Sequence, residues 1–154
     1  MNSESVSESS RDFASVATEL SMLTPDEARD LVAEASSRQM SQEQLVIQKG
    51  MLDAVEMDIV HTLMNPKTVV PGYEILKVIG KGGMGVVYQA RQQNLDRLVA
   101  LKTILVSKIG DQQLVARFEQ EARTVGRMAH PNIVAAYDFG RHEGRVYLAM
   151  ELVE

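Results

Sequence analysis

A glycine-rich segment at residues 80–88, GKGGMGVVY, constrains the fold of this 154-residue chain more than any other feature. Gly80, Gly82 and Gly85 have the spacing G-x-G-x-x-G, and Val87 extends the pattern to G-x-G-x-x-G-x-V. From this pattern alone, a plain β-hairpin turn and a nucleotide-binding loop are equally good interpretations. The segments on either side of the glycines therefore decide what the loop connects.

Short segments rich in β-branched and apolar residues lie on both sides of the glycines, which predicts strands there. This order argues against the dinucleotide-binding fold, in which a helix follows the glycines. Residues 111–128 have helical periodicity and end before Pro131. The hairpin-like connections predict an α+β fold, a five-stranded antiparallel sheet with one helix packed on it. The predicted strands are 73–80, 85–91, 97–105, 132–140 and 145–153.

The N-terminal part of the chain has the signals of short helices instead. Each predicted helix starts at a capping residue that is followed three positions later by Glu or Gln. These pairs are Thr24 with Glu27, Ser41 with Gln44, and Asp53 with Glu56. In the first helix, Ala28, Leu31, Val32 and Ala35 share one face, so we expect a small helical bundle with this face in its core.

Charge divides the chain into the same two parts. The formal net charge is −5, with 12 acidic and 4 basic side chains in residues 1–66, against 9 acidic and 12 basic ones after them. We expect a disordered, polar N-terminus at 1–23, a helical appendage at 24–66, a linker at 67–71 and a separate domain at 72–154. The appendage shows no catalytic constellation, and its expected role is docking to a protein partner or dimerisation.

Composition excludes several classes of function. The chain has no cysteine, and His61, His130 and His142 lack metal-ligand spacing, so no metal site is expected. The C-terminal part carries a small positive charge without a basic run, which argues against a nucleic-acid partner. No apolar run is long enough for a membrane span, and the N-terminus lacks the pattern of a signal peptide, so a cytoplasmic location is expected.

Two charged residues occupy predicted apolar faces. Lys102 follows Val-Ala-Leu inside a strand, and Glu121 shares a helix face with Phe118 and Val125. Taken singly, Lys102 could extend from a strand edge to water, and Glu121 could lie at the margin of the apolar stripe. Taken together, they suggest an ion pair between the sheet and the helix, because an unpaired buried charge would cost several kcal/mol.

With these residues in place, the segment 72–154 resembles the N-terminal lobe of a protein kinase, specifically the eukaryotic-like serine/threonine kinases of bacteria. The glycine-rich loop matches that of the family, and VALK matches the strand that ends in the phosphate-binding lysine, Lys102. Glu121 in FEQEA matches the helix glutamate that pairs with this lysine. HPNIV at 130–134 and YLAMELVE at 147–154 match the fourth strand's approach and the fifth strand with the start of the hinge.

The resemblance implies an ATP site on this lobe. Lys102 would bind the α- and β-phosphates and Glu121 would orient it, so these two are the implied catalytic residues. Val87 and Ala100 would cover the adenine, Met150 would be the gatekeeper, and the backbone of Glu151 and Val153 would meet the adenine edge. The implied ATP-binding residues are Gly80, Lys81, Gly82, Gly83, Met84, Gly85, Val87, Ala100, Lys102, Met150, Glu151 and Val153.

The sequence departs from the family in what it lacks. It contains no HRD, DFG or APE motif, so the catalytic aspartate and the Mg²⁺ ligands are expected in a C-terminal lobe outside this chain. The expected function is that of the ATP-binding part of a serine/threonine protein kinase, which acts on a protein substrate. The chain alone is expected to be inactive. The alternative is a non-catalytic interaction or scaffold protein built on half a kinase fold.

Overall fold

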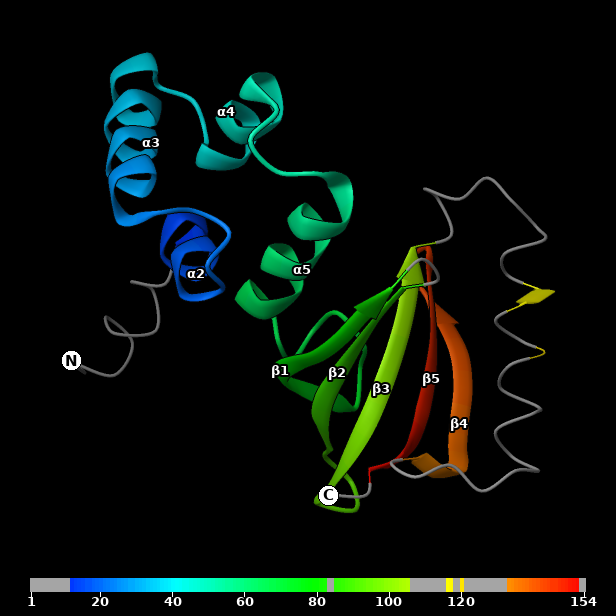
Figure 1. Ribbon diagram of the computed structural model, residues 1–154. Coiled ribbons are helices and arrows are strands. Elements are labelled where there is room, and N and C mark those ends of the chain that lie inside the picture. The colour runs from blue at the N-terminus through cyan, green and yellow to red at the C-terminus, as the bar shows by residue number, and fades with distance from the viewer. Residues whose placement is uncertain (1–11, 83–84, 106–115, 118–119, 121–132, 153–154) are drawn as a thin grey trace. The chain divides into compact units, whose positions relative to one another are not determined.

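The computed structural model describes residues 12–82, 85–105, 116–117, 120 and 133–152. The chain divides into two compact units, Met1–Met64 and Asn65–Glu154. Helices make up the described part of the first unit, and a sheet makes up most of the described part of the second (Figure 1).

The first unit, which we call the helical unit, contains α2 (Phe13–Glu19), α3 (Pro25–Arg38), α4 (Gln42–Lys49) and α5 (Ala54–Met64). The helices α3, α4 and α5 start after the predicted capping residues, which confirms those predictions. Thr24 and Ser41 form complete capping boxes with the residues three positions later. Asp53 and Glu56 exchange the same two hydrogen bonds, at 2.9 and 2.8 Å. Gly50 ends α4 in the left-handed conformation, as a glycine stop does.

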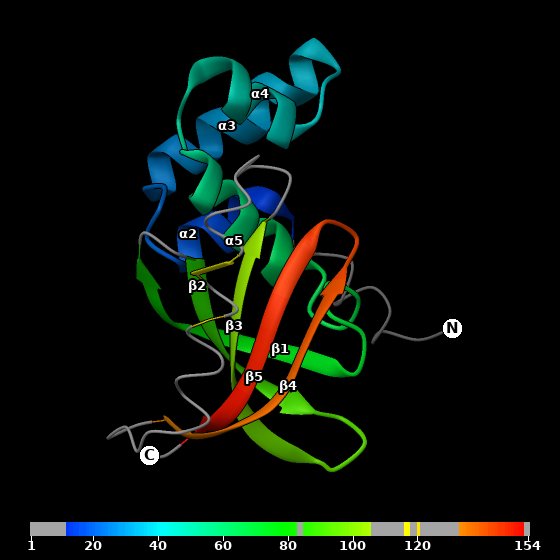
Figure 2. The same cartoon turned by 90° about the vertical axis from the view of Figure 1, so that its right-hand side faces the viewer.

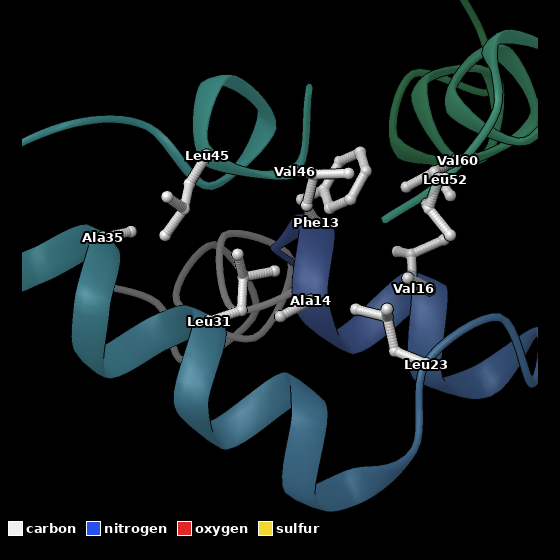
Figure 3. Close-up of a cluster of buried hydrophobic side chains, with 11 residues drawn as sticks. Phe13, Ala14, Val16, Leu23, Leu31, Ala35, Leu45, Val46, Leu52 and Val60 are labelled. Atoms are coloured by element: carbon white, nitrogen blue, oxygen red, sulfur yellow. The ribbon is translucent and has the colours of Figure 1, made fainter. Parts of the chain in front are cut away.

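Apolar side chains from all four helices form one core in the helical unit. On α2, Phe13 and Val16 point toward side chains of α4 and α5, and Ala14 lies beside Leu31 of α3 (Figure 3). Leu31 and Ala35 of α3 are both 3% exposed, as their shared face predicted. Val32 was expected on the same face, but it is 41% exposed. Its position on the helix turns it away from the core.

Helix α2 lies inside the segment that we expected to be a disordered, polar N-terminus, 1–23, so that expectation was wrong for Phe13–Glu19. Asp12 caps the helix by accepting a hydrogen bond from the Ser15 amide. The Gln42 side chain of α4 holds the same end, because it accepts from the Ala14 amide at 2.9 Å and donates to Asp12 at 3.1 Å. Four buried residues, Phe13, Ala14, Val16 and Ala17, supply the apolar contact.

The second unit, the sheet unit, confirms the predicted antiparallel sheet of five strands. The strands are β1 (Tyr73–Gly82), β2 (Gly85–Gln92), β3 (Arg97–Leu105), β4 (Ile133–His142) and β5 (Arg145–Leu152). Their order is β1-β2-β3-β5-β4, so β1 and β4 are the edges (Figure 1), and β3, β5 and β4 lie side by side in Figure 2. Residues 116, 117 and 120 of the predicted helix at 111–128 are helical, and the rest of that helix lies outside the described residues.

Burial alternates along β2, which separates the two faces of the sheet there. Along β2, Val86, Tyr88 and Ala90 are buried, whereas the residues between them are half-buried. Leu101 of β3 pairs with Tyr88 and is buried on the same face. Along β5 the opposite face is buried as well, at Val146, Leu148 and Met150.

The segment expected to be a linker, 67–71, belongs to the sheet unit. Val70 is fully buried, and the Ile75 amide donates a hydrogen bond to the Pro66 carbonyl at 2.8 Å. The segment is therefore packed against the start of β1 and is not a free connection.

Candidate nucleotide site

The glycine-rich segment joins two antiparallel strands, as its flanking residues predicted. Gly80 pairs with Val87, and Gly82 pairs with Gly85, so the ladder continues to the base of the turn. Gly83 and Met84, which complete the predicted loop, lie outside the described residues. The arrangement is a strand–turn–strand hairpin and differs from the strand–helix connection of a dinucleotide-binding fold.

The glycines of this hairpin have different local reasons to be glycine. Gly85 has a φ of +144°, and a Cβ there would lie 2.3 Å from the Thr103 carbonyl oxygen and 2.4 Å from Ile104. No side chain fits in that space, so Gly85 allows β2 to pack closely on β3. A Cβ at Gly80 would meet no described atom within 4 Å. Gly80 therefore leaves open space beside the hairpin.

The sheet register brings several predicted site residues to one face. Val87 pairs with Lys102, and Ala100 pairs with Met150. Residues that lie directly opposite in an antiparallel sheet point to the same face, and so do residues two apart on one strand. Val87, Ala100, Lys102 and Met150 therefore share the face opposite to that of Tyr88 and Leu101. Ala100 and Met150 are buried there, and Val87 and Lys102 are half-buried.

Glu151 lies on the other face, because it pairs with Val99 and follows Met150. This placement suits the prediction that its backbone, and not its side chain, meets the nucleotide. Val153 and Glu121 lie outside the described residues. The Lys102–Glu121 ion pair therefore stays a prediction.

A tyrosine cluster closes the sheet at the end away from the glycines, and sequence reasoning missed it. The buried Tyr73 of β1 donates a hydrogen bond to Asp138 of β4 at 3.3 Å and thereby joins the two edge strands. Its ring lies 6.1 Å from that of Tyr147, and a side chain at Gly140 would clash with Tyr147. Burial, together with the charge and hydrogen bond of Asp138, raises the pKa of Tyr73 to about 12.

A buried cation lies at the start of β5, two residues before Tyr147. Arg145 is 5% exposed, and its guanidinium donates a hydrogen bond to the Thr103 hydroxyl at 3.3 Å. No local sequence pattern predicts either contact, because Arg145 and Thr103 are 42 positions apart, and Tyr73 and Asp138 are 65 positions apart. Among the described residues, no three acidic or histidine side chains gather as a metal site would require.

Comparison with known proteins identifies the class of this lobe. The protein kinase domain model matches residues 73–154, which are more than half of the chain. The chain therefore belongs to the protein kinase domain family, as the motifs predicted. None of the helices in the described part of the chain has the length and apolar character to cross a membrane.

The similar curated proteins are bacterial serine/threonine kinases. The chain is 43% identical to serine/threonine-protein kinase pkn3 of Myxococcus xanthus over 88 residues, which cover 56% of this chain and 16% of that protein. It is 44% identical to PrkC of Bacillus subtilis over 82 residues, 53% of this chain and 13% of that protein. It is 42% identical to PknJ of Mycobacterium tuberculosis over 87 residues, which cover 56% of this chain and 15% of that protein. The chain thus matches only a small part of each relative's length.

Proposed function

We propose that this chain is the ATP-binding N-terminal part of a serine/threonine protein kinase, which transfers the γ-phosphoryl group of ATP to a protein hydroxyl. The observation that carries the proposal is the register of the sheet. The half-buried Lys102 of β3 pairs with Val87 of β2, and Val87 in turn pairs with Gly80 of β1. The buried Ala100 precedes Lys102 by two residues on β3, so both are on the same face. A cation, a glycine hairpin and an apolar surface on one sheet face suit a nucleotide's phosphates and base.

Each group has a separate task in this proposal. The glycine hairpin lets backbone N–H groups approach the phosphate oxygens, since no side chain projects from Gly80. Lys102 supplies a point charge to the α- and β-phosphates, and Glu121 orients its ammonium group. Val87 and Ala100 cover the adenine, with Met150 beside it. The proposed location is the cytoplasm, where ATP is available.

Magnesium and the catalytic base belong to residues outside this chain. Mg²⁺ neutralises charge on the triphosphate in kinases, and its protein ligands follow the hinge in the DFG and catalytic-loop motifs. The chain contains neither motif. Alone, it should transfer no measurable radiolabel from ATP to a generic protein acceptor.

The test uses the full-length protein that contains this chain. Lys102→Met should reduce phosphoryl transfer by at least about a hundredfold, because it removes a charge that stabilises the transferring group. Lys67→Met is the matched control, since Lys67 is an exposed lysine of the same unit outside the sheet. Equal activity of the two variants would contradict the proposed site. A full-length protein without any transfer activity would favour the scaffold alternative.

A further inference from the structure

The helical unit has a groove between α2 and α3 that takes no part in the proposed kinase function. Its volume is about 550 Å³, and its walls include Ala14 and Thr18 of α2 and Ala28, Val32 and Ala33 of α3. A volume of this size lies in the range of binding pockets, roughly 300–1,000 Å³. The groove is open at the surface and borders the core of the unit, because Ala14 belongs to both.

Helix α3 therefore has two apolar faces. One face holds Leu31 and Ala35, which are buried in the core beside Ala14 and Leu45 (Figure 3). The second face follows the spacing of a helical stripe through residues 25, 28, 29, 32 and 33, all of which line the groove. Ala28 also packs against the core, whereas Val32 is left at the surface, inside a concave apolar site.

Acidic residues border this groove. Asp12 is one of the residues that line it. On α3, Asp26 and Asp30 lie next to the groove-lining stripe around the circumference of the helix. Burial tends to raise the pKa of Asp12, but hydrogen bonds from Ser15 and Gln42 outweigh it and lower that pKa. The basic wall residue Arg29 forms an ion pair with Asp26, so it does not offset the other acids. The border of the groove is therefore negative at neutral pH.

The charge decides between two kinds of occupant. Residues 1–66 carry 12 acidic and 4 basic side chains. Two copies of this unit that met through the same groove would bring like charges together, which disfavours a symmetric dimer. A partner with basic side chains around an apolar stripe would meet both the floor and the border of the groove.

We propose that the α2–α3 groove binds an amphipathic helix of a partner protein, with apolar side chains on one stripe and lysines or arginines beside it. Its apolar side chains would contact Ala14, Ala28 and Val32, and its basic side chains would pair with Asp12 and Asp30. This is the helix-in-groove mode of recognition. The inference uses the helical unit only and does not depend on phosphoryl transfer.

The probe is a fluorescein-labelled synthetic peptide of about 15 residues, the length at which a helix becomes stable enough to form. It carries leucines at helical spacing and lysines at the other positions, and a second peptide replaces every lysine with glutamate. Both are titrated with the 154-residue chain at physiological salt, where screening limits nonspecific attraction. Fluorescence anisotropy reports binding.

Two variants make the experiment specific for the groove. Val32→Glu places a carboxylate on the groove floor, and Val55→Glu makes the same change on α5, outside the groove lining. The two valines are matched, because each is 41% exposed. Both variants add one negative charge, which should attract the lysine peptide equally. Circular dichroism and thermal unfolding establish that each variant is folded.

The wild-type chain should bind the lysine peptide at least about tenfold more tightly than the glutamate peptide. Val32→Glu should weaken the lysine peptide by about tenfold or more, since an apolar side chain would then face a buried charge. Val55→Glu should leave it unchanged or slightly tighter. In the wild-type chain, the amide resonances of Ala28, Val32 and Ala33 should shift on titration, which tests the groove even if a variant unfolds.

Several results would overturn the proposal. These are failure of the lysine peptide to bind, equal binding of the two peptides, equal effects of Val32→Glu and Val55→Glu, and peptide-induced shifts that avoid the groove. Sedimentation of the wild-type chain as a dimer that Val32→Glu dissociates would assign the groove to a second copy instead. A kinase-inactive full-length protein would leave all of these results unaffected.

Discussion

The helical unit and the sheet unit are stabilised by side-chain hydrogen bonds of different reach. In the helical unit, the three capping pairs join residues three positions apart. In the sheet unit, Arg145 reaches Thr103 over 42 positions and Tyr73 reaches Asp138 over 65. Gln42 of α4 also reaches Asp12 over 30 positions, so the contrast concerns the capping pairs. Loss of a capping pair should affect one helix end, whereas loss of either contact in the sheet unit should affect several strands. Four substitutions or titrations test this difference, from the largest expected effect to the smallest.

Gly85→Ala should destabilise the sheet unit by about 2–5 kcal/mol, through positive-φ strain and overpacking. The added Cβ would lie 2.3 Å from the Thr103 carbonyl oxygen, which is backbone and cannot move aside as a flexible side chain can. Amide hydrogen exchange should report lost protection in β2, β3 and β5 while α3 and α4 keep theirs.

Gly80→Ala is the matched control for that substitution. Gly80 also lies in the hairpin, but a Cβ there meets no described atom within 4 Å. Its effect on stability should stay within about 1 kcal/mol. Loss of protection in both units after Gly85→Ala, or equal loss from both glycine variants, would contradict the long-range role of Gly85.

The nucleotide affinity of the chain alone tests how far one lobe can form a site. In the proposed site, Val87 and Ala100 would cover one face of adenine, and the opposite face of the base would stay in water. One apolar face of roughly 100 Å², at about 25 cal/mol per Å², accounts for about 2.5 kcal/mol. At about 1.4 kcal/mol per factor of ten, binding of Mg-ATP should be nearly a hundredfold weaker than in the full-length protein, before the missing Mg²⁺ ligands are counted.

Titration calorimetry with Mg-ATP on both proteins measures this difference. The 154-residue chain should give no saturable heat at concentrations that saturate the full-length protein. Equal dissociation constants would show that the sheet face binds the nucleotide without a second lobe.

The range of these contacts also explains which features could be predicted from the sequence. The capping pairs are visible because both partners lie in one helical turn. The sheet and its site face could be predicted because strand alternation and short hairpins fix which residues share a face. Helix α2 was missed because FASVA is a short apolar run in a polar segment, and its stabilising partner, Gln42, comes 30 positions after Asp12.

Other features depend on distances that no local pattern encodes. The Tyr73–Asp138 contact exists only because the sheet brings its two edge strands together. The second face of α3 could not be separated from the first, since Val32 fits the periodic stripe as well as Leu31 does. Periodicity indicates that a residue is on an apolar face, but the packing of the neighbouring helices decides whether that face enters the core.

Tyr73→Phe should destabilise the sheet unit by about 0.5–1.5 kcal/mol at neutral pH, because it removes the hydrogen bond to Asp138 at 3.3 Å and the long one from Gln92 at 3.4 Å. The effect should depend on pH. In the folded chain the pKa of Tyr73 is raised to about 12, against about 10 in an unfolded chain. The neutral phenol is therefore favoured by folding, and its stabilisation is complete below pH 10 and is lost as the pH rises from about 10 to 12.

Urea unfolding of the wild-type chain and of Tyr73→Phe at a series of pH values measures this dependence, because their difference cancels the titration of other groups. The difference should shrink above pH 10. Tyr147→Phe is the control for removal of a phenol in the same cluster. Its hydroxyl forms no hydrogen bond with the residues that the structure describes, and burial and the Asp138 charge raise its pKa. A constant difference between wild type and Tyr73→Phe from pH 8 to pH 12 would contradict the raised pKa.

Thr24→Ala should have the smallest effect and the most local one. The Thr24 hydroxyl accepts a hydrogen bond from the Glu27 amide at 3.1 Å, and the Glu27 carboxylate accepts one from the Thr24 amide at 2.9 Å. Loss of an N-cap costs about 0.5–2 kcal/mol, and this exposed cap should lie near 1 kcal/mol. Amide hydrogen exchange should increase in the first turn of α3, while Leu45 in α4 and Leu101 in β3 keep their protection, because no other element depends on these two hydrogen bonds. Thr24→Ser, which keeps the hydroxyl, should restore the protection of the first turn. If Thr24→Ala instead raised exchange throughout the chain, the two units would unfold together, and the contrast between local and long-range stabilisation would fail.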